Sequence, residues 1–358
     1  MDRITKDIRY SATLSSNFYS SEESFKNVID NIFVHSWHFI TDDEEFTVKD
    51  YAYPFILMQD VLPEPLFLIM NNDQLNCFSN VCTHRGNILI NDKGKLNKNI
   101  VCRYHGRSFN LNGKFISMPC TEGMKDFPTS RDNLPSISAN KWKKFIFCSI
   151  DPKFSINDLM LDVEKRVAWM PIQDFVFRED LSNIYTVNAN WALYCDNYLE
   201  GFHIPFIHED LNKVLDYNNY RVETFKYSNL QIGYANDGDV CFDLPEDSPD
   251  YGMNIAAYYF WLFPNIMLNF YPWGLSVNII TPLSISKTKV EFKSYVWKDN
   301  LLNKGAGADV NKVELEDQQV VESVQKGINS RLYSYGRFSP KMEQGVHHFH
   351  SLVKEFMK

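Results

Sequence analysis

Two short loops, each carrying one cysteine and one histidine, constrain this chain more than any other feature. One residue separates Cys82 from His84, two separate Cys102 from His105, and seventeen residues lie between the two pairs. Thiolates and imidazoles are metal ligands, so the two loops together offer a complete set for one metal centre. Each loop continues with a glycine, which lets the backbone turn tightly around such a centre. The chain must therefore fold so that the two loops meet.

Two occupants of this centre agree with the ligand set. Zinc is bound by two cysteines and two histidines, but its loops usually space their cysteines as C-x₂₋₄-C. A [2Fe–2S] cluster with cysteines on one iron and histidines on the other needs one thiolate and one imidazole from each loop, as found here. The pairing therefore favours the cluster over zinc. Tyr104 is a candidate hydrogen-bond donor to a cluster sulfur, and Arg107 is either a cluster neighbour or a solvated side chain.

A second region of interest is the segment NWALYCDNYLEGFHIPFIH, residues 190–208. Apolar and aromatic residues recur along it at three- and four-residue steps, which predicts a helix with one buried face. Asn190 stands where a helix cap is expected. The segment is therefore predicted to be one helix that ends near its second histidine.

The far end of this predicted helix carries a candidate metal site. Glu200 and His203 are three residues apart and share a helix face. His208 is five residues beyond His203, and Pro205 between them should bend or end the helix and bring the second imidazole round. Two histidines with nearby carboxylates favour a metal that has open coordination positions. The alternative is a buried helix end with two hydrogen-bonded histidines.

A late helix, expected over residues 310–332, supplies a further carboxylate. Its apolar stripe consists of Val310, Val313, Val320, Val321, Val324 and Ile328. By its spacing Asp317 lies on that stripe, whereas Glu314 and Glu316 are expected to fall off it. A carboxylate on a buried helix face is costly unless it is paired or coordinated. Asp317 is therefore preferred to Glu316 as a third ligand, the alternative being a buried aspartate held by hydrogen bonds.

The remaining patterns predict an α+β protein with two domains. Residues 15–40 have the spacing of an N-terminal helix. From 39 to 150, short β runs alternate with turn clusters, which is typical of a small antiparallel β domain. Six or more strands between 220 and 297 predict a twisted antiparallel sheet flanked by helices. We therefore expect a cluster-binding domain at 39–150 and a second domain formed by 1–38 and 151–358.

Charge, apolar runs and cysteine number exclude several classes of protein. Lys and Arg number 36 against 45 Asp and Glu, and the formal charge of −9 argues against a nucleic-acid or anionic-membrane partner. There is no run of eighteen apolar residues and no signal-peptide core at the start, so no membrane span or secretion is expected. The seven cysteines are an odd number in a chain large for a disulfide framework, which favours a cytoplasmic location.

The motifs resemble those of the Rieske non-haem iron oxygenases, the family of aromatic-ring-hydroxylating dioxygenase alpha subunits. The likeness is carried by NVCTHRG (80–86), CRYHGRSF (102–109) and the 190–208 segment, and it covers essentially the whole chain. Within the family, the DNYLEGFH run looks most like choline and carnitine monooxygenases. The resemblance implies a Rieske [2Fe–2S] cluster in the first domain and a mononuclear Fe(II) in the second. The implied ligands are Cys82, His84, Cys102 and His105 for the cluster, and His203, His208 and one of the pair Glu316–Asp317, for which we take Asp317, for the iron.

The resemblance also implies a co-substrate and partners. Dioxygen is the co-substrate, and NAD(P)H supplies electrons through a separate ferredoxin or flavin reductase, since the chain has no Gly-rich dinucleotide fingerprint. Glu200 is expected to accept hydrogen bonds from His203 and from His84 or His105 of a neighbouring subunit, which makes the working unit a homotrimer. Most ring-hydroxylating relatives carry an aspartate at this point. The side chain of Glu200 is longer by one methylene, so its reach between the two histidines differs from that of the aspartate. The alternative for Glu200 is an ordinary partner of His203.

The sequence is compatible with two chemical classes of substrate, quaternary amines and aromatic compounds. Aromatic residues crowd the strands after the iron helix, and half of them should face the iron cavity because side chains alternate along a strand. These residues are Tyr258, Tyr259, Phe260, Trp261, Phe263, Phe270, Tyr271 and Trp273. Such rings cage a quaternary ammonium, sandwich a planar aromatic substrate or simply fill the sheet core. The likeness favours an oxygenase for choline, carnitine or a betaine. One alternative is an aromatic-ring hydroxylase. The other is a Rieske electron carrier without oxygenase activity, but the second ligand set, His203, His208 and Asp317, argues against an electron carrier.

Overall fold

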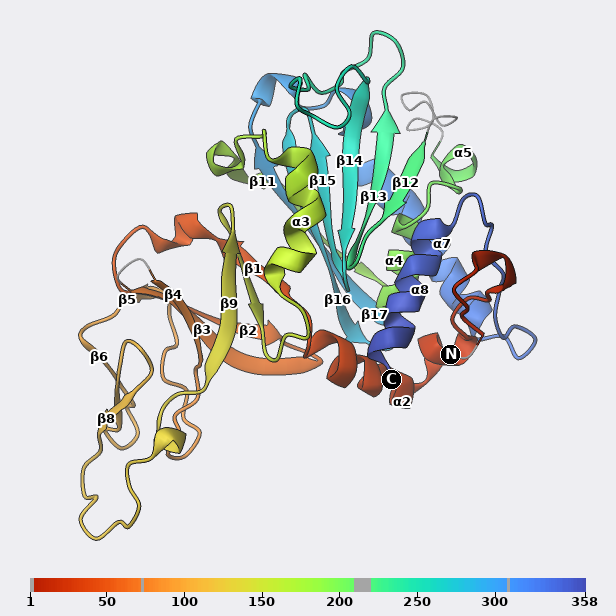
Figure 1. The fold of residues 1–358 in the computed structure, drawn as a ribbon. Helices are drawn as coiled ribbons and strands as arrows, with labels where there is room; N and C mark the ends of the chain where they lie inside the picture. The colour runs from red at the N-terminus through yellow and green to blue at the C-terminus, as the bar shows by residue number, and fades with distance from the viewer. Residues whose placement is uncertain (1–2, 72–73, 209–219, 308–309) are drawn as a thin grey trace. The chain divides into compact units, whose positions relative to one another are not determined.

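The computed structural model describes residues 3–71, 74–208, 220–307 and 310–358. The chain divides into two compact units (Figure 1). The first, Val34–Lys153, contains both Cys/His loops and is called the Cys/His unit. The second joins the residues up to Phe33 to Phe154–Lys358 and is called the helix–sheet unit.

The Cys/His unit is built of antiparallel strands. A seven-stranded sheet has the order β1-β10-β9-β4-β3-β2-β5, and a small sheet has the order β6-β7-β8. Cys82 and Cys102 lie in one apolar core with Phe67 and Phe109, so burial of the thiols anchors both loops. The strands are β1 (His38–Asp42), β2 (Tyr51–Met58), β3 (Leu62–Asn71), β4 (Gln74–Ser79), β5 (Gly94–Lys95), β6 (Asn99–Val101), β7 (Ser108–Asn110), β8 (Phe115–Ser117), β9 (Ser136–Trp142) and β10 (Phe145–Ser149).

The helix–sheet unit contains one seven-stranded antiparallel sheet of order β11-β17-β16-β15-β14-β13-β12. The last six strands in the chain form a meander, because each pairs with the next, and β11 closes the edge beside β17. These strands are β11 (Val176–Val187), β12 (Arg221–Thr224), β13 (Ser228–Tyr234), β14 (Ile255–Leu262), β15 (Ile266–Tyr271), β16 (Gly274–Ser284) and β17 (Lys287–Val296). With its helices, this sheet confirms the predicted α+β class.

The described part of the same unit also contains α-helices. They are α1 (Ser16–Ser20), α2 (Glu22–Val28), α3 (Ile156–Val167), α4 (Trp191–Tyr198), α5 (Ile204–Ile207), α7 (Val310–Ile328) and α8 (Gln344–Phe356). Helix α4 packs against α7, α8 and β16. The side chain of Asn190 caps α4 by accepting a hydrogen bond from the Ala192 N–H. The backbone N–H of Asn190 donates to Gln325 Oε1 of α7 over 2.7 Å. The cap therefore also fixes α4 against α7. No helix in the described ranges is long and apolar enough to cross a membrane.

The predicted single helix over residues 190–208 is wrong, because the chain breaks after Tyr198 and restarts as α5. The carboxylate of Glu200 accepts hydrogen bonds from the N–H groups of Phe202 and His203, which lie just before α5. Pro205 lies in the first turn of α5, where its missing N–H costs nothing. The break therefore comes before the proline, and the proline belongs to the second helix.

Candidate functional site

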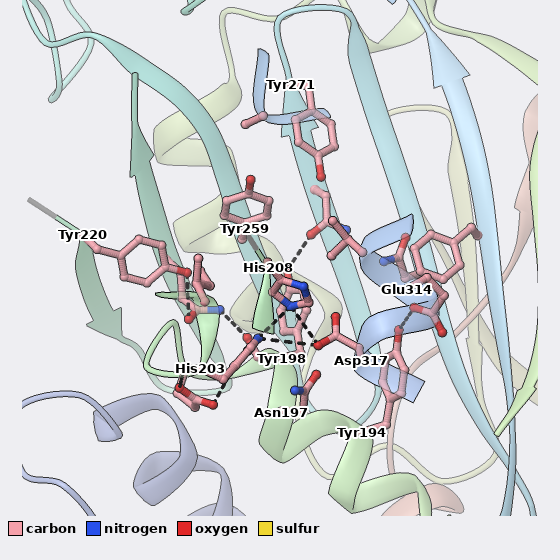
Figure 2. A pocket seen from close by; sticks show the side chains of 18 residues that line it. Tyr194, Asn197, Tyr198, His203, His208, Tyr220, Tyr259, Tyr271, Glu314 and Asp317 are labelled. Carbon is pink, nitrogen blue, oxygen red and sulfur yellow. Dashed lines mark hydrogen bonds and ion pairs between the residues drawn. The ribbon is translucent and has the colours of Figure 1, made fainter. Parts of the chain in front are cut away.

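Three side chains predicted to bind a metal converge at one point of the helix–sheet unit. His203 and His208 flank α5, and Asp317 projects from α7, as Figure 2 shows. The two Nε2 atoms are 3.2 Å apart. Asp317 Oδ1 is 3.0 Å from His208 Nε2 and 3.5 Å from His203 Nε2. One ligand atom from each residue thus lies within 4.8 Å of the others.

These distances fit a single metal ion. Two ligand atoms about 2.1 Å from a metal and about 90° apart are themselves about 3.0 Å apart. The three separations of 3.0, 3.2 and 3.5 Å therefore match a ligand set that occupies one face of an ion. Two neutral imidazoles and one carboxylate are the donor set of non-haem Fe(II) sites that leave positions open for dioxygen and substrate.

Each imidazole is oriented by a carboxylate on its other nitrogen. His203 Nδ1 lies 2.7 Å from Glu200 Oε1, and His208 Nδ1 lies 2.8 Å from Glu316 Oε2. Such bonds keep the proton on Nδ1 and aim Nε2 at the shared point. Glu316, considered above as an alternative ligand, instead contacts His208 from behind.

The electrostatic field at this point favours a cation. Burial lowers the pKa of the free His208 imidazole, but the carboxylates of Asp317 and Glu316 raise it more, and the result is a pKa above the usual value. The same carboxylates would stabilise a metal ion in place of the proton.

A cavity of ≈ 120 Å³ opens beside the three side chains (Figure 2). Its lining comes from α4, α5, α7 and the facing side of the sheet, and consists of Tyr194, Asn197, Tyr198, Glu200, His203, Ile204, His208, Tyr220, Gln231, Tyr259, Asn269, Tyr271, Asn278, Phe292, Ala306, Val313, Glu314 and Asp317. Gln231, Tyr259 and Asn269 are in register on neighbouring strands, so they form one row across the floor.

Hydrogen bonds fix the polar side chains of this floor to the end of α4. Tyr198 donates to Asn269 Oδ1 over 2.6 Å, and its carbonyl accepts from Gln231 Nε2 over 2.7 Å. The second bond satisfies a carbonyl that the end of α4 leaves without a helical partner. Tyr220 donates in turn to Gln231 Oε1 over 3.1 Å. The wall and floor of the cavity are therefore one connected network.

Two of the eight strand aromatics proposed for the cavity line it. Tyr259 of β14 and Tyr271 of β15 face the site, whereas their neighbours Tyr258, Phe260 and Phe270 occupy the alternate positions. Sequence reasoning did not find Tyr198 or Tyr220, since one was assigned to the helix core and the other lies at the start of a strand.

Glu314 is the main correction to the sequence analysis. It was expected to fall off the buried stripe of α7, but its side chain is 2% exposed and lines the cavity. Its carboxylate accepts hydrogen bonds from the Tyr194 hydroxyl and, over 3.0 Å, from Gln318 Nε2. Burial raises the pKa of Glu314 to about 7, and the nearby Asp317 adds to the rise. Its spacing is compatible with this burial, because it lies one turn before Asp317 and two turns before the buried Val321.

The two Cys/His loops lie together in the Cys/His unit. Gly86 and Gly106 adopt φ of 71° and 72°, and their N–H groups bond back to the carbonyls of Cys82 and Cys102 over 3.0 Å each. Both thiols are buried, and the ring centroids of His84 and His105 are 4.7 Å apart on the exposed side. Burial raises the pKa of Cys82, and the adjacent Cys102 thiol raises it further.

This arrangement fits a mixed-ligand [2Fe–2S] cluster. Paired thiols lie inside and paired imidazoles outside, which matches cysteines on one iron and histidines on the other. The side chain of Asn87 also reaches Cys102 Sγ, at 3.6 Å.

Arg107 connects the two loops from behind, which corrects its interpretation as a solvated arginine. It is 2% exposed and donates to the side chain of Asp132 over 2.7 Å and to its carbonyl over 3.1 Å. The same carbonyl accepts the Thr83 hydroxyl over 2.9 Å. Since Thr83 belongs to the first loop and Arg107 follows the second, Asp132 holds both.

Curated relatives match this chain over nearly its whole length. The carnitine monooxygenase oxygenase subunit of Escherichia coli strain K12 is 28% identical over 367 residues, which covers 97% of this chain and 94% of the relative. The chloroplastic choline monooxygenase of Arabidopsis thaliana is 26% identical over 378 residues, with 97% and 83% covered.

Solved structures show the same fold. The quaternary ammonium Rieske monooxygenase CntA in complex with L-carnitine gives a TM-score of 0.75 at 22% identity and covers 98% of this chain and 97% of its own. Naphthalene 1,2-dioxygenase with indole bound gives 0.71 at 17% identity, with 100% and 95% covered.

Two family descriptions account for the two units. The Rieske [2Fe-2S] domain matches residues 36–128, and the ring hydroxylating alpha subunit (catalytic domain) matches residues 168–358. Proteins built of these two domains use a Rieske cluster, a mononuclear iron and dioxygen. This chain therefore belongs to the ring-hydroxylating alpha-subunit family of Rieske non-haem iron oxygenases, and it is an oxygenase of that class.

Proposed function

We propose that this chain is the terminal oxygenase component of a Rieske system that hydroxylates a small quaternary or N-methylated amine. The observation that carries the proposal is the convergence of His203, His208 and Asp317 on a cavity walled by tyrosines. Aromatic faces attract organic cations, most strongly where water is excluded. The curated relatives above are named as choline and carnitine monooxygenases, which supports the same substrate class.

The ligand assignment follows from the two sets of side chains. Cys82 and Cys102 hold one iron of the cluster, and His84 and His105 hold the other. His203, His208 and Asp317 hold the mononuclear iron. The unit Val34–Lys153 is thus the Rieske domain, predicted from sequence as 39–150, and the remainder of the chain is the catalytic domain.

When both cofactors are bound, the cluster supplies electrons and the mononuclear iron activates dioxygen for insertion into a substrate C–H bond. The residues of this chain prepare that step by position. Glu200 and Glu316 hold the Nδ1 protons of His203 and His208, so that each Nε2 presents a lone pair to the metal. The tyrosines that line the cavity would hold the amine beside His203, His208 and Asp317, the residues that would hold the iron.

The same proposal includes partners. Glu200 has one oxygen facing His203 of its own chain, and we propose that a cluster histidine of a neighbouring copy contacts it in a homotrimer, so that electrons pass between subunits. A separate ferredoxin or flavin reductase draws the electrons from NAD(P)H. We place the assembly in the cytoplasm.

Substrate-stimulated oxygen uptake tests the function. The purified oxygenase is combined with a reductase system, and uptake is measured with choline, carnitine, betaines and simple aromatic acids. We expect stimulation by an amine together with about three irons per chain, two in the cluster and one at the second site. Stimulation by aromatic acids alone would replace the amine by an aromatic substrate. A chain that carries only about two irons and takes up no oxygen would instead be an electron carrier.

A further inference from the structure

The buried carboxylate of Glu314 has no cation opposite it in the described structure. Its hydrogen-bond partners are two neutral donors, Tyr194 and Gln318, and no ion pair joins it to a lysine, arginine or histidine among the described residues. A buried charge without a counter-charge is costly, because two neutral hydrogen bonds recover only part of its lost hydration. Glu314 is therefore suited to receive a positive charge from a molecule that enters the cavity.

Apart from the metal-binding histidines, the side chains around this cavity offer further attraction for a cation and none for an anion. The rings of Tyr198, Tyr259 and Tyr271 line it, and so do the carboxylates of Glu200 and Asp317. None of the eighteen lining residues, all of them in the described ranges, is lysine or arginine. Away from the metal site, a carboxylate group on a substrate would therefore meet amide and hydroxyl groups but no counter-charge.

We propose that Glu314 is the counter-ion for the ammonium group of the substrate, and that the site selects N-methylated amines of net positive charge over zwitterions that also carry a carboxylate. This inference rests on the proposed amine oxygenase activity and narrows it. It makes Glu314 a specificity-determining residue. Figure 2 shows the arrangement, with Glu314 and Asp317 on the same helix and Tyr194 beside Glu314.

Glu314 and Asp317, two of the carboxylates of α7, have different roles. Asp317 belongs to the metal-binding set, whereas Glu314 lies one turn earlier, and its oxygens are held by Tyr194 and Gln318. Hydrogen bonds to both oxygens fix the carboxylate in place before the substrate arrives. A fixed counter-ion discriminates by charge, because it gains nothing from a neutral molecule of the same shape.

Binding to the resting holoenzyme, without reductase, tests the proposal independently of turnover. Isothermal titration compares choline with 3,3-dimethylbutan-1-ol, its uncharged carbon analogue, and with two zwitterions, glycine betaine and carnitine. We expect wild type to bind choline at least about tenfold more tightly than the neutral analogue and than either zwitterion.

Three variants isolate the contribution of Glu314. In Glu314→Gln the preference for choline over the neutral analogue should fall to about twofold or less, while affinity for the neutral analogue stays within about threefold of wild type. Glu314→Asp keeps the charge and should keep part of the preference. Glu322→Gln removes a carboxylate from the same helix outside the cavity lining and should leave the wild-type preference intact.

The outcomes separate this proposal from the function on which it rests. If no amine binds and none stimulates oxygen uptake, the amine oxygenase itself is wrong. If amines stimulate uptake but Glu314→Gln keeps the preference for choline, Glu314 is not the counter-ion. Zwitterions that bind wild type as tightly as choline would also overturn the proposed selection by charge.

Discussion

Replacing Glu314 by glutamine should stabilise the iron-free protein at alkaline pH. The pKa of this carboxyl is raised from 4.5 to about 7 because it is buried. A raised pKa means that the folded chain holds the proton more tightly than the unfolded chain does. Stability is therefore lost as pH rises through the window from about 4.5 to 7. The difference corresponds to roughly 3 kcal/mol once the pH is above 8. Glutamine is a neutral analogue of the protonated acid and avoids this loss.

Urea unfolding of wild type and Glu314→Gln at pH 5 and pH 8 measures the effect. The mononuclear iron is first removed with a chelator, since a nearby cation would lower the pKa of Glu314. Tryptophan fluorescence reports mainly on the helix–sheet unit, which holds Trp169, Trp191, Trp261, Trp273 and Trp297. The variant should gain under about 1 kcal/mol at pH 5 and about 3 kcal/mol at pH 8. An equal gain in unfolding free energy at pH 5 and pH 8 would refute the raised pKa of Glu314. The control variant Glu322→Gln should show no such pH dependence.

Three further substitutions test the two metal sites. Asp317→Ala should lower the iron content from about three to about two per chain and leave the electron paramagnetic resonance of the cluster unchanged, and retention of all the iron would remove Asp317 from the ligand set. Glu200→Gln should weaken iron binding about 10–100-fold in chelator competition, because the carboxylate no longer fixes His203, and wild-type affinity would contradict that role. Arg107→Met should destabilise the Cys/His unit by roughly 2–4 kcal/mol and speed the loss of cluster absorbance on heating, because it leaves the Asp132 carboxylate without its buried partner. A cluster as durable as that of wild type would show that Asp132 does not hold the loops.

The Cys/His loops were readable from sequence because their chemistry is local. Both ligands of a loop lie within four residues, and the glycine that follows supplies the positive φ that the turn requires. The support behind the loops was not readable. Arg107 meets Asp132 across 25 positions of sequence, and nothing in the spacing of either residue indicates the partner.

The broken helix shows how a local rule fails when a side chain competes with it. Pro205 was expected to end the helix, since proline in a helix interior removes a hydrogen bond. In the structure α4 has already ended at Tyr198, and the Glu200 carboxylate bonds the N–H groups of Phe202 and His203 in the segment that leads into α5. Glu200 was assigned a role toward His203, and this second contribution to the backbone was not foreseen.

Periodicity predicted which side chains are buried or face the cavity only in part, and for different reasons in the sheet and in α7. Alternation along β14 separates Tyr259 from Tyr258, but the sequence does not say which of the two faces the cavity. On α7 the stripe was drawn through the valines, and Val324 on that stripe is exposed, whereas Glu314 is buried. Burial of Glu314 is decided by α4, which brings the Tyr194 hydroxyl to its carboxylate. A polar residue with a tertiary partner is where a hydrophobic stripe misleads.

The carboxylates of the site together explain why a cationic substrate suits it. Glu200, Glu316 and Asp317 surround two imidazoles that bind metal only when neutral, so their negative charge exceeds that of a divalent ion. Ionised Glu314 adds to this excess. A zwitterion brings no net charge and places an anion in the same field, whereas a monocation reduces the excess. Binding of a monocation should therefore lower the pKa of Glu314, and choline affinity should rise as the pH rises through the pKa of Glu314 in the holoenzyme. The pKa values of Tyr194 and Tyr185 are raised by burial and by the charge of Glu314, so neither tyrosine ionises near neutral pH. The Glu314→Gln variant should lose the pH dependence, and an unchanged profile in that variant would assign it to another group.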